Sequence, residues 1–246
     1  MTESLLLFFG LLFLVAILYA SVGHGGASGY LALMAIFSVA PNVMKPTALL
    51  LNLFVSATSF IQFYRGNHFK WKLFLPFAIA SIPMAFLGGM VVVDGTIYKK
   101  ILGLLLLIPV ARFLIFPQFD VSDIKKSNIG LSIVIGATIG LLSGMIGIGG
   151  GIILSPVLLL LKWTDQKQTA AISAAFIFVN SVAGLAGQVT KGIHFTSDMF
   201  LYVVIAFTGG MIGAYFGAHR FKQTVLKNVL AIVLLMAAYK LIIPHA

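Results

Sequence analysis

The chain has 246 residues, of which 60% are hydrophobic and only 9% are charged, and its mean hydropathy is +1.09. A soluble domain with so few charges would expose too much apolar surface to stay dissolved. The composition therefore excludes an ordinary soluble enzyme and predicts an integral membrane protein.

The formal net charge of +10 would suggest a nucleic-acid partner in a soluble protein. Here the basic residues lie in short loops beside apolar segments, which is typical of membrane topology. We therefore expect no nucleic-acid partner. The chain has no cysteine, which excludes disulfides and thiolate metal sites.

Ten apolar segments follow one another along the chain, at residues 4–22, 28–40, 46–64, 73–93, 97–117, 127–146, 150–161, 168–190, 196–218 and 224–243. A helix of about 20 residues crosses a hydrocarbon core about 30 Å thick. The second and seventh segments are too short to span upright, and each follows a cluster of glycines that disfavours a helix. We expect two half-helices that meet near the midplane; a shallow re-entrant form of both, which leaves eight spans, stays open.

The chain also divides into two similar halves around a polar connection at residues 120–128. Three matches occur in the same order in both halves: 23–27 with 147–151, 62–69 with 188–195, and 85–90 with 206–211. With five segments in each half, the halves would have opposite orientations in the membrane. The sequence thus predicts an all-α membrane protein of about ten hydrophobic segments in two inverted five-segment repeats, 1–122 and 123–246, within a single membrane domain. Most lysines and arginines lie in inner loops if both termini are outside.

Acidic residues are absent from the interior of the apolar segments. The six in the chain lie at a terminus or in loops: Glu3, Asp94, Asp120, Asp123, Asp165 and Asp198. A carrier of cations normally keeps a carboxylate within the membrane to pair with its cargo. Paired carboxylates for acid–base catalysis are missing as well. We therefore expect no metal site and no cofactor.

Glycines and neutral polar groups remain as candidates for binding a ligand. Open N–H groups at a helix start bind anions, and glycines let the backbone approach an oxyanion closely. Amide donors suit the same ligand, and a protonated His24 could add charge or carry a proton. The predicted substrate-binding residues are Gly23, His24, Gly25, Gly26, Ala27, Asn52, Gln62, Gly147, Gly149, Gly150, Gly151, Asn180 and Gln188. Alternatively, the glycines only permit tight packing, the polar side chains tie helices together, and the histidine has no role.

The second glycine cluster also resembles a known signature. Residues 147–151, followed by Ser155-Pro156-Val157-Leu158, are similar to the G-x-G-G-G…P-x-L pattern of the TauE/SafE family of sulfite exporters (TSUP). The resemblance implies a multi-pass protein of the bacterial cytoplasmic membrane that exports sulfite, sulfoacetate or a related sulfur-containing anion. The first half departs from the pattern at His24, Ala27 and Ala32, so we expect the halves to bind the ligand unequally.

The leading hypothesis is a secondary transporter that holds a small anion at two facing glycine-rich helix N-termini. A passive anion channel would use the same donors with weaker binding. A transporter for a different carboxylate or inorganic anion, and an intramembrane enzyme that uses His24 with a serine, are further alternatives. The expected partners are a small anionic substrate and the lipid bilayer, and a homo-oligomer is left open.

Overall fold

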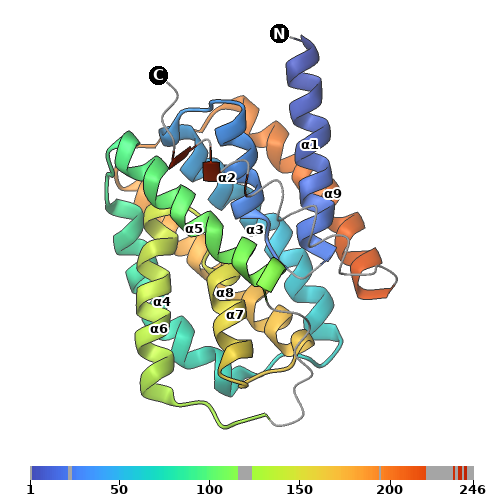
Figure 1. Cartoon of the computed structure of the whole chain (residues 1–246), viewed down its shortest axis with the longest axis vertical. Coiled ribbons are helices and arrows are strands. Elements are labelled where there is room, and N and C mark those ends of the chain that lie inside the picture. The colour runs from blue at the N-terminus through green and yellow to red at the C-terminus, as the bar shows by residue number, and fades with distance from the viewer. Residues whose placement is uncertain are drawn as a thin grey trace.

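The computed structural model of the chain is a bundle of helices (Figure 1). It describes residues 2–21, 24–115, 124–193 and 195–219, together with residues 235, 238, 239, 241 and 242. Within these residues no strand is formed. This agrees with the all-α prediction, since lipid offers no partner to an open sheet edge.

Nine helices lie in the part of the chain that the structure describes: α1 Thr2–Ser21, α2 Ala27–Ile36, α3 Pro41–Arg65, α4 Trp71–Met90, α5 Gly95–Ile115, α6 Ile129–Ile146, α7 Gly151–Leu160, α8 Gln166–Val189 and α9 Ser197–His219. Each coincides with one of the first nine apolar segments predicted from the sequence. The tenth predicted segment, 224–243, and the predicted boundary at residue 122 fall largely or wholly outside the described residues.

Six of these helices, α1, α3, α4, α6, α8 and α9, are long and apolar enough to cross a membrane. Large apolar side chains on them face outward, such as Leu6 on α1, Ile79 on α4 and Val134 on α6. Their exposed fractions are 67%, 69% and 62%, which would be costly in water but suits a lipid-facing surface. The chain is a multi-pass membrane protein.

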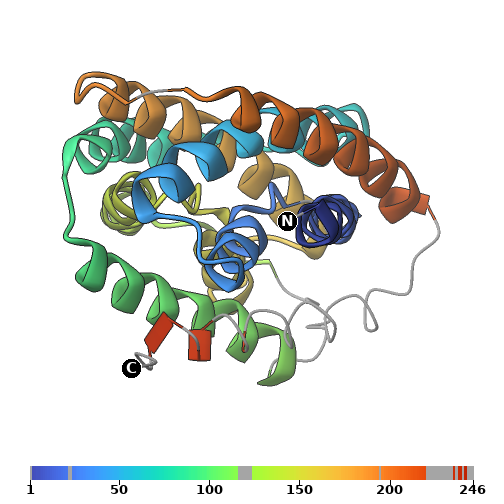
Figure 2. The same cartoon turned by 90° about the horizontal axis from the view of Figure 1, so that it is seen from above.

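Helices α2 and α7 are the two short elements, with ten residues each. A helix of that length rises about 15 Å, half of the hydrocarbon thickness. Helix α2 ends at Ile36, four residues before the predicted end, because Ser38 takes a left-handed φ of 59° and α3 already begins at Pro41. Helix α2 lies in the upper half of Figure 1 and α7 in the lower half, and in Figure 2 α1 and α6 are seen end-on on either side of α2.

The long helices pack in a regular pattern. Helix α4 packs against α6 and α8, α9 packs against α1 and α3, and α3 packs against α8. Small residues allow this close approach. A methyl group on Gly88 of α4 would meet α6 at Leu141, and one on Gly209 of α9 would meet α1 at Phe13. The adjacent Gly89 and Gly210 lie against α8 and α3, at Gly184 and Val55.

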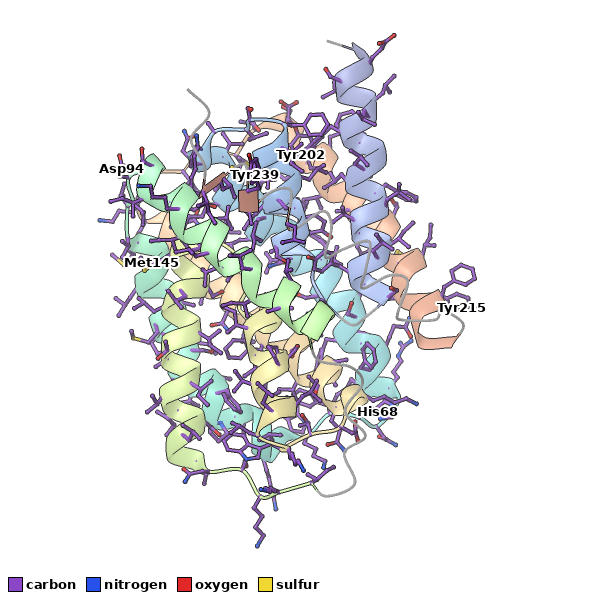
Figure 3. The ribbon with its side chains drawn as sticks, viewed as in Figure 1. His68, Asp94, Met145, Tyr202, Tyr215 and Tyr239 are labelled. Carbon is purple, nitrogen blue, oxygen red and sulfur yellow. The ribbon has the colours of Figure 1, made fainter. Side chains whose placement is uncertain are left out.

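Side chains cap several helices at the ends of the bundle. The Oδ1 atoms of Asn128 and Asp165 accept hydrogen bonds from Leu131 N and Gln168 N, at the starts of α6 and α8. Asp94 caps α5 by accepting from Thr96 N and Ile97 N, and these bonds hold the pKa of its carboxyl below the ordinary value. Figure 3 shows Asp94 and His68 at opposite ends of the long axis, so α4 runs the length of the bundle between them.

Candidate functional site

The two glycine clusters stand directly before the short helices, as the sequence predicts. Gly26 precedes α2 with a φ of 91°, and Gly150 precedes α7 with a φ of 77°. Gly147 and Gly149 are also left-handed, with φ of 90° and 72°. Residues with a Cβ rarely adopt this conformation, so glycine is needed for the chain to enter each half-helix. Ala27 and Gly151 are the first helical residues, and Gly23 lies outside the described residues.

The starts of α2 and α7 differ from those of α6 and α8 because no side chain caps them. The residues before them, Gly26 and Gly150, have no side chain to accept a hydrogen bond, and neither first turn holds an acidic residue. In neither helix does a carboxylate in the first turn compensate the positive end of the helix dipole. Such a helix start favours a negatively charged ligand.

Both glycine clusters meet at the same two side chains. A Cβ built on Gly25 would lie 2.7 Å from Oδ1 of Asn52 and 2.8 Å from Cγ2 of Ile177. A Cβ built on Gly149 would lie 2.5 Å from Nδ2 of Asn52 and 2.8 Å from the same Cγ2 atom. Helices α3 and α8 supply these side chains from the two halves of the chain. The crossing of α3 and α8 thus brings together segments that are more than 120 residues apart.

Asn52 is the central polar group of this meeting point. Its side chain is fully buried, its Nδ2 donates to Oγ of Ser181 over 3.4 Å, and its Oδ1 has no partner. An amide can turn by half a revolution, so that Oδ1 accepts from Ser181 and Nδ2 points toward Gly25. Asn52 can therefore offer either a donor or an acceptor to a ligand at the glycines.

Tyr30 is a further candidate for the site that its residue type did not indicate in the sequence. The side chain is fully buried, and its hydroxyl has no partner. A Cβ on Gly26 would lie 2.6 Å from this hydroxyl oxygen, so the group lies at the N-terminus of α2. The signal was present in the spacing, because helical side chains point back over the preceding turn and Tyr30 follows Gly26 by four residues.

A second polar group joins the first cluster to α7 and α8. Nε2 of His24 lies 2.9 Å from Oγ of Ser155, and that oxygen lies 2.8 Å from Oγ of Ser173. Oγ of Ser155 also donates to the carbonyl of Gly151 over 2.8 Å. In the sequence Ser155 stood out only as part of the family signature. Its contact with a histidine 131 residues away could be recognised only in the folded chain.

Asn180, Gln62 and Gln188 are not among the side chains nearest to the cluster glycines. Asn180 is buried, its Nδ2 donates to the carbonyl of Phe176 on its own helix over 2.8 Å, and its Oδ1 has no partner among the described residues. Gln62 is exposed near the end of α3, ten residues beyond Asn52, or about 15 Å along the axis. Gln188 is buried near the end of α8 with an unpartnered Nε2, about 10 Å along the axis beyond Ser181. The structure does not bring the two glutamines to the glycine clusters.

Comparison with known proteins assigns the family. Residues 8–241 match the family model described as "Sulfite exporter TauE/SafE". A probable membrane transporter protein of Sinorhizobium fredii is 36% identical over 234 residues, which are 94% of this chain and 95% of that protein. One of Methanocaldococcus jannaschii is 30% identical over 189 residues, covering 72% of this chain and 70% of that protein. No solved structure matches the chain. The match over almost the whole length confirms the resemblance seen in the glycine signature, and the chain belongs to the TauE/SafE family of membrane transporters.

Proposed function

We propose that the protein is a secondary transporter that exports a small sulfur-containing oxyanion, such as sulfite, sulfoacetate or a related organosulfonate, across the cytoplasmic membrane. The anion is held where the glycine clusters before α2 and α7 meet Asn52. The observation that carries the proposal is the buried, unpartnered hydroxyl of Tyr30 at the uncapped start of α2. A buried donor without a partner is costly, and an anion at the helix start would satisfy it.

The charge balance of the interior supports an anion as the cargo. Among the described residues, every polar side chain that is fully buried is neutral: serine, threonine, asparagine, glutamine or tyrosine. A cation there would meet no carboxylate to replace its water. An anion would meet helix dipoles, a hydroxyl and an amide, which stabilise negative charge without a metal.

The packing supports alternating access by two inverted repeats. The two halves correspond helix by helix, with α1 matched to α6, α3 to α8 and α4 to α9. Helix α4 packs against α6 and α8, and its counterpart α9 packs against their counterparts α1 and α3. Gly88 and Gly89 of α4 lie against α6 and α8. The matched glycines of α9, Gly209 and Gly210, lie against α1 and α3. In transporters of this plan, one repeat rocks against the other around a fixed site near the midplane. The crossing of α3 and α8 at Asn52 would be that site.

The proposed function is tested by ligand-dependent stability. The purified protein is unfolded by heat with sulfite, thiosulfate, sulfoacetate, sulfate or chloride. A ligand at 100 times its dissociation constant raises the free energy of unfolding by about 2.7 kcal/mol. We expect stabilisation by a sulfur oxyanion at millimolar concentration and little or none by chloride. The proposal is wrong if none of the oxyanions stabilises the protein.

A carrier and a channel differ in their kinetics. Liposomes loaded with unlabelled anion should take up labelled anion by counterflow, and the rate should saturate. Flux that follows voltage without saturation would instead support a passive channel. Preferential stabilisation by a carboxylate would point to a different substrate.

The contact between His24 and Ser155 also bears on the enzyme alternative. In a hydrolase the base is oriented by a third group and the serine gives its proton to the histidine. Here Ser155 donates to the carbonyl of Gly151 instead, and the relatives are transporters. Replacing His24 by alanine would abolish an enzyme, whereas a transporter would keep part of its flux.

Tyr30→Phe should separate ligand binding from folding. The hydroxyl has no protein partner, so its removal should leave the free protein as stable as before or more stable. A hydrogen bond to a charged group contributes about 1.5–3 kcal/mol, so the affinity for the oxyanion should fall by roughly tenfold or more. Thermal unfolding with and without the anion measures both effects.

Tyr19→Phe is the matched control, because the Tyr19 hydroxyl is buried but lies 2.8 Å from Oγ of Ser28. It should lower stability in the absence of ligand and leave the affinity largely unchanged. Equal affinities of Tyr30→Phe and the wild type would remove Tyr30 from the site.

A further inference from the structure

His24 occupies a position between the two halves of the site. It lies on the connection from α1 to α2, where its backbone N–H donates to the carbonyl of Tyr19 over 3.0 Å. Its side chain is half-buried and reaches Ser155 on α7 at 2.9 Å. The corresponding residue of the second cluster is Ile148, so only the first cluster carries a side chain that can change its charge near neutral pH.

The hydrogen bonds of Ser155 determine which atom of His24 carries hydrogen. A serine hydroxyl has one hydrogen to donate and two lone pairs that accept. Ser155 gives its hydrogen to the Gly151 carbonyl, so it accepts from both the Ser173 hydroxyl and Nε2 of His24. The three contacts are satisfied together only when Nε2 bears a hydrogen. A second proton on the ring therefore leaves the contacts of Ser155 unchanged.

Other ionisable groups lie on the helices that surround His24. Tyr19 on α1 and Tyr30 on α2 are phenols, which ordinarily titrate near 10. On α3, Lys45 lies against Gly147 of the second cluster, and its ammonium group donates to the carbonyls of Gly89 and Val91 over 3.3 Å, at the end of α4. Helix α7 presents Ser155 to the histidine, Ser173 of α8 contacts Ser155, and the Asp165 carboxylate caps the start of α8, eight residues before Ser173. The imidazole is thus the ionisable group that links the first glycine cluster to α7.

We propose that His24 is the proton-binding residue of the transporter and takes up one proton together with the anion. This inference rests on the proposed function. One N–H bond forms on the imidazole as a hydronium ion becomes water, and the proton returns to water when the anion leaves. An anion beside the ring stabilises its charged form, so each ligand strengthens the binding of the other.

Co-binding of a proton defines what crosses the membrane. Sulfite and sulfoacetate can each carry two negative charges, so a complex with one proton keeps one net negative charge. A negative interior still drives that complex outward. The pH gradient then modulates export, because a lower pH on the loading side increases occupancy of the site.

The experiment measures affinity as a function of pH with two probes, sulfoacetate and thiosulfate, neither of which titrates between pH 5.5 and 8.5. Because the anion favours the protonated ring, the affinity for the anion should be high at low pH. It should decrease as the pH rises and the His24 imidazole in the complex loses its proton. We expect the dissociation constant to be about tenfold lower at pH 5.5 than at pH 8.5. Calorimetry in two buffers with different ionisation enthalpies should show net proton uptake on binding near pH 7.

His24→Gln keeps a polar side chain of similar reach but cannot take up a proton. Its affinity should be almost independent of pH, and its binding of the anion should occur without proton uptake. His68→Gln is the matched control: this histidine lies beside Gly66 at the end of the bundle (Figure 3) and should keep the full pH dependence.

Measurements on the wild type alone can overturn the inference, so the test does not depend on how well the variant folds. Binding of either probe with the same affinity at both pH values and no proton uptake excludes a proton role for His24 and leaves the anion site intact. Full pH dependence in His24→Gln assigns the proton to another group. Failure of both probes to bind at any pH contradicts the proposed function itself.

Discussion

Asn52→Asp is expected to abolish oxyanion binding at pH 8. The substitution changes the size of the side chain very little, but it places a carboxylate where both glycine clusters meet. Two like charges about 4 Å apart repel by about 4 kcal/mol at an effective dielectric constant of 20, which is roughly a thousandfold in affinity. Thermal unfolding in the presence of sulfite, thiosulfate or sulfoacetate should therefore show no stabilisation at millimolar concentration.

The same variant should recover part of its binding when the pH is lowered, because a buried carboxylate readily takes up a proton and becomes neutral. Asn67→Asp is the control. Asn67 is exposed in the turn after α3 with a φ of 56°, a conformation that aspartate tolerates. Binding by Asn52→Asp that equals the wild type at pH 8 would place the site elsewhere, and preferential stabilisation by a cation would indicate a cationic cargo.

Gly25→Ala is expected to lower the affinity for the oxyanion by tenfold or more. Gly25 is not among the glycines with a positive φ, so its backbone accepts a side chain. The added methyl would lie 2.7 Å from Oδ1 of Asn52 and 2.8 Å from Cγ2 of Ile177, and both side chains would have to move. Overpacking of this kind costs about 1–3 kcal/mol, and the methyl also displaces the Asn52 amide from the ligand.

Gly10→Ala is the matched control, because Gly10 lies on an exposed face of α1 and a methyl there would meet nothing within 4 Å. Both variants are compared by thermal unfolding and by counterflow. An unchanged affinity in Gly25→Ala would show that the meeting point at Asn52 is not where the anion binds. Gly26 and Gly150 are poorer positions for this test, since their φ values of 91° and 77° would strain any substituted residue.

The helices were predictable from the sequence, and their ends differ from the predicted ones by at most five residues within the described part of the chain. In lipid a backbone must satisfy its own hydrogen bonds, so an apolar run of sufficient length becomes a helix whatever surrounds it. The largest difference within the described residues concerns the start of α3, which begins at Pro41 and not at residue 46. Proline is favoured at the first position of a helix, and Pro46 inside the helix removes one backbone hydrogen bond without ending it.

The candidate site was only partly predictable. The glycine clusters were evident because their role is local: a chain that turns abruptly into a half-helix needs left-handed residues at that point. Asn52 was one of several polar residues on α3. Gln62 seemed more suitable because it has a repeat-matched partner, yet its side chain is exposed near the end of the helix. A match between repeats identifies equivalent positions but does not say how deep in the bundle they lie.

By itself, the sequence determined that the chain enters a membrane, which segments form its helices, and which two points break them, since each follows from neighbouring residues alone. Tertiary structure decided which groups meet there: the Asn52 amide between two distant glycine clusters, the Tyr30 hydroxyl left without a partner, and His24 against Ser155. The reason is that a contact across more than 100 residues depends on how α3 and α8 cross and how closely their small residues let them approach.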